Sequence, residues 1–496
     1  MKKTKNIIIF ILIMLMVGGV ILNQRVSDLD ELWNYNFARN IADGKLPYKD
    51  FNMIQTPLLP LIASVFLKII ANELLVMRIL AIILCSLIFF MIYKILERLE
   101  INSYMSLLFT VGIGFLFKDH LRIDYNLAII LIILFIIYIE LKNKSKDIIN
   151  INKKKDILIG ILAGTTILFK QTTGLFLTVI AICYPILFIK EKQEVKVFLK
   201  SALFRFFGAA IPVVLLIIYI LAFNIWNDFI SYTFEGIKTF SNFIFYTELL
   251  KNEKWIIKIL AVILPINIII QFIFGIAKNN NSKLNKNIAI LFVYSIASLI
   301  TILPISDEIH FLIGMLPNII ALAYFINLII NKITKNKIKI FIKYFITCLT
   351  TGMIIFASFK SILSLIEYLK NANQYTELEH FKYIPISDGL KNQIIILDEY
   401  IKKDEKKIYI LDATACAYII PINICNKNYD MFLVGNLGKD GEDGIIKEIS
   451  SMKDVKLLII KDGYNRNWQN PEKVREYIKS NLNKTGDILL FDIYEL

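Results

Sequence analysis

Long apolar runs alternate with short polar links along the first 360 residues of the chain. Each run is long enough, or nearly long enough, to cross about 30 Å of hydrocarbon as a helix. The predicted spans cover residues 6–23, 74–93, 101–117, 125–141, 156–170, 172–189, 203–223, 256–276, 288–304, 309–330 and 338–359. This pattern predicts a polytopic α-helical membrane protein with about 11 transmembrane helices.

One further apolar run, from Pro57 to Ile70, does not belong to this series. It is shorter than the roughly 20 residues that a spanning helix needs. Counting it as a span would also move every later Lys-rich link to the other side of the membrane. Proline at its start suits a first helical turn. We therefore predict an interfacial or re-entrant helix here, inside a first outer loop of residues 24–73 that begins with an amphipathic helix from Glu31 to Ala42.

The pattern changes after residue 360, where charged residues become frequent. The stretches KKIYILD, VKLLIIKD and DILLFDIYEL are typical of short buried strands. Asn470-Pro471-Glu472 predicts the start of a helix to about Leu482, with Asn470 as its capping residue. We therefore predict a transmembrane domain over residues 1–360 and a small extracytoplasmic α/β domain over residues 361–496.

Basic residues are concentrated in alternate links between the spans. These links contain Lys94 and Arg98, Lys142 to Lys155, Lys190 to Lys200, Lys278 to Lys286, and Lys332 to Lys339. Loops rich in Lys and Arg face the cytoplasm in most membrane proteins. The alternation therefore predicts a multi-pass protein of the cell membrane, with a cytoplasmic N-terminus and an extracytoplasmic C-terminal domain.

The composition agrees with a membrane protein. Hydrophobic residues make up 56% of the 496 residues, and the mean hydropathy is +0.59. The net charge of +14 is carried by links between apolar runs, so no nucleic-acid partner is expected. The first residues lack a clear small-x-small cleavage site, which predicts a retained anchor instead of a removed signal peptide. Cys416 and Cys425 could pair outside the cell, although their spacing does not require it.

The first outer loop offers a candidate catalytic carboxylate. Asp30 follows the first span directly and could act as a general base toward an acceptor hydroxyl. Alternatively, Asp28 or Asp30 caps the next helix, with Glu31 in its first turn. Asp28-Leu29-Asp30 is also a D-x-D pattern, which by itself is a weak indication of a divalent cation.

Two further outer links carry cations. Lys118 and Arg122 could clamp a phosphate while Asp124 orients them or a sugar hydroxyl, or all three could simply be solvated. Lys170 stands between two apolar runs and calls for an anionic partner such as a lipid headgroup or a lipid-linked phosphate. Snorkelling of Lys170 to the membrane interface is the competing interpretation.

A last outer link contains Asp307, Glu308 and His310 in the sequence PISDEIHF. These side chains could bind sugar hydroxyls, or they could form only a structural turn. A zinc site is not expected, since no second His or Cys lies nearby in the sequence. Four outer links thus bring polar groups to one predicted membrane face, which indicates a site at the outer interface.

The order of these features resembles a known family. The landmarks are the anchor, Asp30-Glu31, Tyr35, Ala38-Arg39, Gly44, Pro47-Tyr48, the helix at Pro57, LRIDYN, the segment Gly160 to Lys170, and SDEIH. Over roughly residues 1–330 this arrangement resembles the GT-C glycosyltransferases of the protein O-mannosyltransferase and lipid A aminoarabinose transferase type (family 39). The C-terminal domain resembles no family by its motifs.

The resemblance implies a polyprenyl-phosphate sugar as donor. It also implies that Asp30 is the base, that Asp124 is the acid of the second outer loop, and that Lys170 matches a family lysine. One departure concerns the interfacial helix, before whose proline the aminoarabinose enzymes carry a lysine. This chain has Gln55-Thr56-Pro57 there, so that phosphate-binding role is not transferred.

We therefore predict a membrane glycosyltransferase that moves a hexosyl or pentosyl group, with inversion, to a glycan, lipid or protein acceptor outside the cytoplasm. Asp30 is the predicted catalytic residue. The predicted substrate-binding residues are Glu31, Tyr35, Lys118, Arg122, Asp124, Lys170, Asp307 and His310. No cofactor is expected and a divalent cation is not favoured, because cationic side chains can stabilise a departing phosphate. The alternatives are a lipid-linked glycan transporter or flippase, and a non-catalytic glycan-assembly protein.

Overall fold

The computed structural model describes residues 2–26, 29–141, 151–189, 191–239, 243–277, 282–332, 336–422, 429–464 and 470–496. The chain divides into two compact units. The helix-bundle unit comprises Met1–Ile21, Ala81–Ile217 and Phe243–Ser364, and the α/β unit comprises Leu22–Leu80, Ile218–Asn242 and Leu365–Leu496. The contacts thus group the first outer loop with the C-terminal residues. The predicted boundary at residue 360 stays a prediction about domains that fold on their own.

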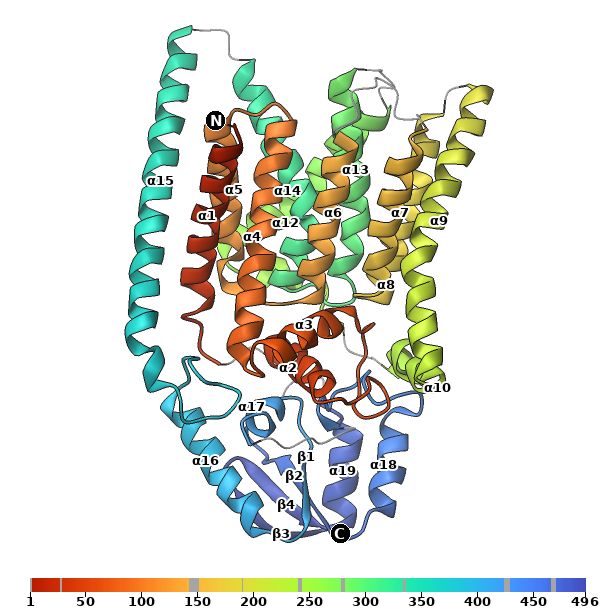
Figure 1. The fold of residues 1–496 in the computed structure, drawn as a ribbon, viewed down its shortest axis with the longest axis vertical. Coiled ribbons are helices and arrows are strands. Elements are labelled where there is room, and N and C mark those ends of the chain that lie inside the picture. Colours follow the sequence, from red (N-terminus) through yellow and green to blue (C-terminus); the bar gives the residue numbers. More distant parts are fainter. Residues whose placement is uncertain are drawn as a thin grey trace. The chain divides into compact units, whose positions relative to one another are not determined.

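The helix-bundle unit consists of long apolar helices that run side by side (Figure 1). They are α1 (Lys2–Ile21), α4 (Leu74–Arg98, from Ala81 onward), α5 (Ser103–Phe117), α6 (Tyr125–Leu141), α7 (Lys153–Ile167), α8 (Gln171–Cys183), α9 (Lys192–Ala222), α12 (Trp255–Phe272), α13 (Lys283–Leu299), α14 (Glu308–Asn331) and α15 (Asn336–Asn371, to Ser364). These helices match the predicted spans one by one.

Length and composition support a membrane location for these helices. In the described part of the chain, 8 helices are long and apolar enough to cross a membrane. The shorter helices α5, α6 and α7 have 15, 17 and 15 residues. The predicted fold class, a polytopic α-helical membrane protein, is confirmed.

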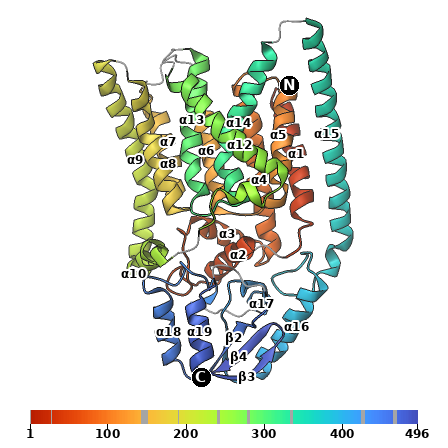
Figure 2. The same cartoon turned by 180° about the vertical axis from the view of Figure 1, so that it is seen from behind.

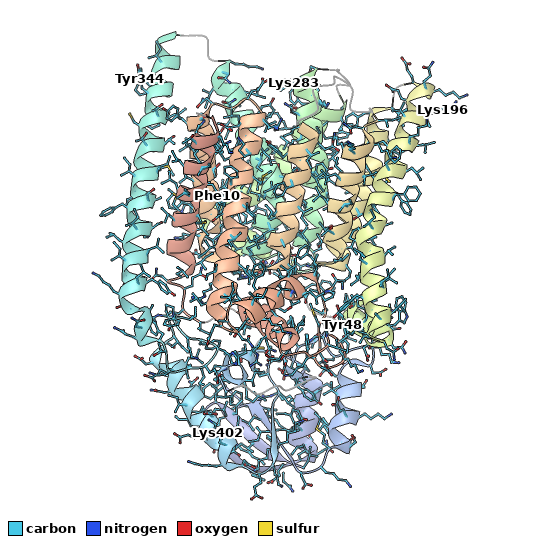
Figure 3. All side chains as sticks on the ribbon, in the orientation of Figure 1. Phe10, Tyr48, Lys196, Lys283, Tyr344 and Lys402 are labelled. Carbon is cyan, nitrogen blue, oxygen red and sulfur yellow. The ribbon has the colours of Figure 1, made fainter. Side chains whose placement is uncertain are left out.

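Two of the Lys-rich links meet at the same end of the bundle. Lys196 on α9 and Lys283 on α13 both lie at this end (Figure 3). Parts of the basic links, at residues 142–150, 190, 278–281 and 333–335, lie outside the described residues. The links before α6, α8 and α14, which carry predicted site residues, and the link before α12 lie at the opposite end (Figure 1).

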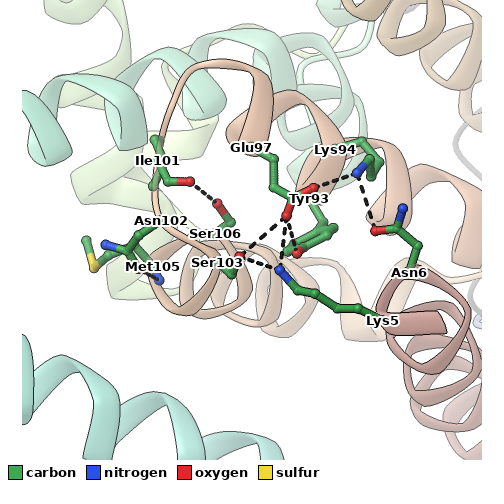
Figure 4. Close-up of polar contacts among 10 residues, drawn as sticks. All are labelled: Lys5, Asn6, Tyr93, Lys94, Glu97, Ile101, Asn102, Ser103, Met105 and Ser106. Atoms are coloured by element: carbon green, nitrogen blue, oxygen red, sulfur yellow. Dashed lines mark hydrogen bonds and ion pairs between the residues drawn. The ribbon is translucent and has the colours of Figure 1, made fainter. Parts of the chain in front are cut away.

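A polar cluster ties the start of α1 to the end of α4 and the start of α5 (Figure 4). The Glu97 carboxylate accepts from Lys5 Nζ at 3.2 Å and from the Tyr93 hydroxyl at 2.6 Å. Lys94 pairs with the same carboxylate at 2.5 Å, and Lys5 also bonds the Ser103 hydroxyl. Lys94, which the sequence analysis considered only for the charge of its link, therefore belongs to a cluster that connects helices.

Glycines allow α7 and α9 to approach closely. A Cβ on Gly160 would lie 2.1 Å from the Arg205 carbonyl oxygen, and one on Gly164 would lie 2.4 Å from that of Ala209. Small residues spaced four apart are typical of such contacts between membrane helices. The Gly160 to Lys170 segment, which the sequence singled out as a family landmark, therefore contributes directly to helix packing.

A buried ionic cluster joins α6, α7 and α9. Arg205 donates to Glu140 and to Asp156, each at 3.0 Å, and to the Ala181 carbonyl at 2.7 Å. Lys155 also pairs with Glu140. Arg205, Glu140 and Asp156 are all buried, and such groups are tolerated inside a bundle when they pair with one another. The sequence analysis did not identify this cluster.

The α/β unit combines the first outer loop with the C-terminal residues. From the first loop it contains α2 (Leu29–Ala42), α3 (Leu58–Ile69) and the start of α4, and it also contains the short α10 (Trp226–Ile230). The C-terminal elements are α16 (Asp388–Lys403), β1 (Lys407–Ile410), α17 (Cys416–Ile419), α18 (Gly441–Ser451), β2 (Val455–Ile460), α19 (Glu472–Asn481), β3 (Asn483–Ile488) and β4 (Phe491–Glu495). The predicted helices of the first outer loop are confirmed as helices.

The C-terminal elements form a small four-stranded sheet in the order β1-β2-β4-β3. β1 and β2 are parallel, and β4 is antiparallel to both β2 and β3. Ile449 of α18 and Val474 and Ile478 of α19 pack with Leu457 and Ile459 of β2 in one apolar core. The two helices lie next to the sheet (Figure 2). The prediction of a small α/β arrangement after residue 360 is confirmed.

Two local predictions in this region are wrong. DILLFDIYEL does not form one strand, because β3 and β4 are separate strands that pair with each other. Asn470 is not the capping residue of α19, whose N-cap is Pro471. The Asn470 side chain instead donates to Asp412 Oδ1 at 2.6 Å and accepts from the Ala413 amide at 3.3 Å.

The predicted pairing of Cys416 stays untested, because Cys425 lies outside the described residues. Cys416 is buried, and its thiol donates to the Asp430 carbonyl at 2.9 Å. In this position it behaves as a small core residue.

Candidate functional site

The predicted site residues fall into two groups. Asp30, Glu31 and Tyr35 lie on α2 of the α/β unit. The other six, in the links of the helix-bundle unit, are Lys118, Arg122, Asp124, Lys170, Asp307 and His310.

Asp30 lies in the first turn of α2 and its side chain is partly exposed. α2 begins at Leu29, one residue before Asp30, so Asp30 lies inside the helix. Asp28, and with it the D-x-D pattern, lies outside the described residues. Asp30 is therefore not the capping residue. It lies at the end of the helix where the backbone dipole attracts negative charge.

Glu31 forms a fork-shaped ion pair with Arg78. Arg78 Nε lies 3.0 Å from Glu31 Oε1, and Arg78 Nη2 lies 3.0 Å from Glu31 Oε2. Both side chains are buried: Glu31 is 3% exposed and Arg78 is 0% exposed. Two parallel bonds of this kind fix the geometry as well as the charge. Glu31 thus connects α2 to the start of α4, and its predicted contact with substrate stays a prediction.

Tyr35 is fully buried on the same helix. Its hydroxyl donates to the Asn72 carbonyl at 2.9 Å and lies 3.2 Å from His380 Nδ1. Burial raises the pKa of the Tyr35 phenol well above its ordinary value, so the phenol remains protonated at neutral pH. The Tyr35 hydroxyl thus joins α2 to Asn72 in the first outer loop and to His380 in the C-terminal residues. Its predicted role in substrate binding stays a prediction.

A buried polar network holds α2 against the C-terminal residues. Asn36 Nδ2 and Asn40 Nδ2 donate to the same Asp430 oxygen, Oδ2, at 2.9 and 3.0 Å. Trp33 Nε1 donates to the Ala413 carbonyl at 3.0 Å. Polar groups buried in this way specify one arrangement, because each alternative would leave them unpaired. The C-terminal residues therefore help to position the helix that carries Asp30.

Asp124 begins α6 and caps it. Its Oδ1 accepts from the amides of Asn126 at 2.6 Å and of Leu127 at 3.2 Å. Arg122, two residues earlier, is buried at 9% exposure. The helix cap accounts for the position of Asp124 without any substrate, and the phosphate and sugar contacts predicted for Arg122 and Asp124 stay predictions.

Lys170 lies beside the first turn of α6. Its Nζ donates to Asn126 Oδ1 at 3.4 Å and lies 5.2 Å from the centre of the Tyr125 ring. Lys170 directly precedes α8. The structure therefore brings together the links that contain Asp124 and Lys170, which the sequence separates by more than forty residues.

Asp307 caps α14. Its Oδ1 accepts from the His310 amide at 2.9 Å and contacts His310 Nδ1 at 2.7 Å. Burial raises the pKa of the Asp307 carboxyl, but the bonds and charge of His310, together with the charge of Arg122, bring this pKa below its ordinary value. Asp307 and His310 thus form the structural turn that the sequence offered as one alternative, and Arg122 adds its charge to this turn.

The sequence analysis did not identify a neighbouring charged group centred on Lys254. Lys254 Nζ lies 2.9 Å from Asp119 Oδ2 and 3.2 Å from Glu308 Oε1, and His120 Nε2 lies 3.6 Å from the same Glu308 oxygen. Lys254 could have been chosen as a candidate from the sequence, because it lies in the predicted outer link that ends at Trp255. Three links therefore converge on one charged cluster at this end of the bundle.

This arrangement places cationic side chains next to carboxylates, as an anionic substrate with hydroxyl groups would require. Among the described residues there is no group of three or more His, Cys, Asp or Glu side chains that could hold a metal ion.

No protein-family model and no curated protein sequence matches the chain. Several solved structures, in contrast, have a similar fold. The apo oligosaccharyltransferase of Archaeoglobus fulgidus has a TM-score of 0.52 at 11% identity, with 92% of this chain and 69% of that chain covered. Apo ArnT from Cupriavidus metallidurans has a TM-score of 0.53 at 10% identity, covering 100% and 98%. ArnT bound to undecaprenyl phosphate gives 0.50 at 9% identity, covering 98% and 97%. The chain therefore has the fold of the GT-C membrane glycosyltransferases.

Proposed function

We propose that the protein is a membrane glycosyltransferase. The substrate would be a polyprenyl-phosphate sugar, from which a hexosyl or pentosyl group passes to a glycan, lipid or protein acceptor on the extracytoplasmic side. The observation that carries the proposal is the likeness to ArnT, which extends over 100% of this chain and 98% of that one. One of the ArnT structures holds undecaprenyl phosphate, which is the kind of donor carrier proposed for this chain.

In the proposed reaction, the Asp30 carboxylate takes the proton of an acceptor hydroxyl. The acceptor oxygen attacks the anomeric carbon from the side opposite the phosphate, so the configuration inverts. The bond between the anomeric carbon and the phosphate oxygen breaks, and its electron pair leaves with the polyprenyl phosphate. Positioned proton transfer of this kind contributes about 10²–10⁴-fold in rate.

Cationic side chains would stabilise the departing phosphate, whose negative charge grows in the transition state. Lys170, with Arg122 or Lys118, is proposed for this role. Lys170 is supported by its position next to the first turn of α6, which Asp124 caps. Because cationic side chains can stabilise this charge, we propose that transfer needs no metal ion.

The test is release of free polyprenyl phosphate from a panel of polyprenyl-phosphate sugars by the full-length protein in lipid. We expect turnover of at least one donor, a loss of about 10²–10⁴-fold for Asp30→Asn, and no change with a metal chelator. Asp398→Asn is the matched control, because Asp398 lies on α16 and pairs with the exposed Lys402 one turn later at 2.6 Å.

Each contrary result has a separate meaning. Equal turnover by wild type and Asp30→Asn would remove Asp30 as the base. Loss of turnover with the chelator would overturn the proposal of a metal-free reaction. No turnover with any donor would contradict the transferase itself.

A further inference from the structure

An apolar groove opens between α1, α5 and α15 of the helix-bundle unit. Its cavity volume is about 160 Å³, and its walls include Val17 of α1, Phe115 of α5 and Phe356 of α15. The three helices lie next to one another in both views of the unit (Figures 1 and 2). An apolar cavity of roughly this size is large enough to take up a small hydrocarbon.

α15 contacts its neighbours at two points along its length, and Ser361, at the second point, also lines the groove. Toward one end, Thr350 of α15 donates to the Tyr104 carbonyl of α5 at 3.5 Å. Toward the other, Ser361 of α15 donates to the Met16 carbonyl of α1 at 3.5 Å, and a Cβ on Gly19 would lie 2.7 Å from the Ser361 carbonyl oxygen. These contacts join α15 to α5 and α1, so the groove belongs to the packing of these three helices.

Glycine keeps part of the groove open. Gly114 of α5 lines it, and a Cβ at this position would meet nothing nearer than the Phe89 ring, 4.0 Å away. A larger side chain at residue 114 would therefore project into the groove without displacing backbone.

Two lysines are the only charged residues that line the groove in the described part of the chain: Lys118, just after α5, and Lys360 on α15. Both are exposed. The carboxylate of Asp119, which follows Lys118 in the chain, accepts from Lys254 at 2.9 Å. The groove thus combines an apolar wall with positive charge and no opposing carboxylate in its lining.

We propose that this groove binds an anionic phospholipid, with an acyl chain against the apolar wall and the phosphate between Lys118 and Lys360. Basic side chains beside a membrane surface attract anionic headgroups, and a zwitterionic phospholipid would gain far less from the same pair. Lys118 is also one of the two side chains proposed to assist Lys170 at the departing phosphate, so the variants below change Lys360, which has no proposed part in the transfer reaction.

The test is native mass spectrometry of the full-length protein, titrated with phosphatidylglycerol or phosphatidylcholine of the same acyl chains. Wild type should bind phosphatidylglycerol preferentially. Lys360→Gln should weaken this binding about fivefold, the factor expected for one charge near an anionic surface, whereas Lys360→Arg should retain it. Gly114→Leu should weaken phospholipid binding, because the larger side chain would occupy space that the acyl chain needs. Lys200→Gln, which removes an exposed lysine of α9, is the control and should bind as wild type does.

Three results would overturn the proposal. Equal binding of the two phospholipids would remove the role of charge. Unchanged binding by Gly114→Leu, in protein with wild-type thermal stability, would show that the lipid lies elsewhere. Displacement of phosphatidylglycerol by an equimolar polyprenyl phosphate would assign the groove to the donor instead.

Discussion

Several polar residues that the sequence offers as chemical groups have clear structural roles in this chain. Asp124 and Asp307 cap α6 and α14, and Glu31 is held by both arms of the Arg78 guanidinium. Asp30, in contrast, is not a cap and is partly exposed. At the scale of single residues, helix caps and an ion pair account for Asp124, Asp307 and Glu31, and the role of Asp30 as a base stays a prediction.

His120 gives a residue-scale prediction about pH. Burial lowers the pKa of this imidazole below the ordinary 6.5, with Arg122 and Lys254 adding to the effect and Glu308 opposing it. The unfolded chain therefore binds the proton more readily, and folding stability should fall as the pH decreases through 6.5. We expect the thermal midpoint of the purified protein to decrease between pH 8 and pH 5, and this decrease to be smaller in His120→Gln. An identical pH dependence in the variant would show that other groups control it.

The caps could have been anticipated, whereas the ion pairs could not. Asp124 and Asp307 each stand immediately or almost immediately before an apolar run, which is the usual sequence signal for an N-cap. Nothing local in the sequence links Glu31 to Arg78 or Lys254 to Asp119. These partners are brought together only by the packing of helices that are distant in the chain.

At the scale of elements, α2 depends on residues almost four hundred positions away. Its Asn36 and Asn40 both donate to Asp430, and its Trp33 donates to the Ala413 carbonyl. The sequence predicted the helix correctly from its apolar spacing. The partners of its polar face were missed, because side-chain amides carry no signal for a specific distant carboxylate.

This network predicts the effect of removing Asp430. Asp430→Ala leaves two buried amide donors without this acceptor, at a cost of about 1–3 kcal/mol for each unsatisfied group. We expect a lower thermal midpoint and, because α2 carries Asp30, lower turnover of the polyprenyl-phosphate donor. Asp398→Asn should change neither property. Wild-type stability in Asp430→Ala would contradict a positioning role for the network.

At the scale of the whole molecule, the apolar runs are the strongest signal in the sequence, and all of them appear as helices. The short strands near the C-terminus were harder to predict, since DILLFDIYEL contains parts of two paired strands and the turn between them. A tight turn between two apolar stretches is easily read as one continuous strand when no Gly or Pro marks it.

The predicted sidedness can be tested on the intact chain. If the Lys-rich links face the cytoplasm, a reporter that is active only outside the cytoplasm should work when fused after Leu496 and fail when inserted after Glu194. A reporter that works in the cytoplasm should give the reverse pattern. Cytoplasmic activity at residue 496 would invert the predicted topology, and with it the proposed side of the reaction.

The ionic cluster around Arg205 has a consequence for the biogenesis of the protein. Glu140 and Asp156 enter with α6 and α7, whereas their principal partner, Arg205, follows on α9. Lys155 pairs with Glu140, but the ion pair of Asp156 is with Arg205, and uncompensated charge within a membrane helix is costly. α6 and α7 therefore reach their lowest energy only after α9 packs against them. This part of the bundle can complete its packing only once α9 has been synthesised and inserted.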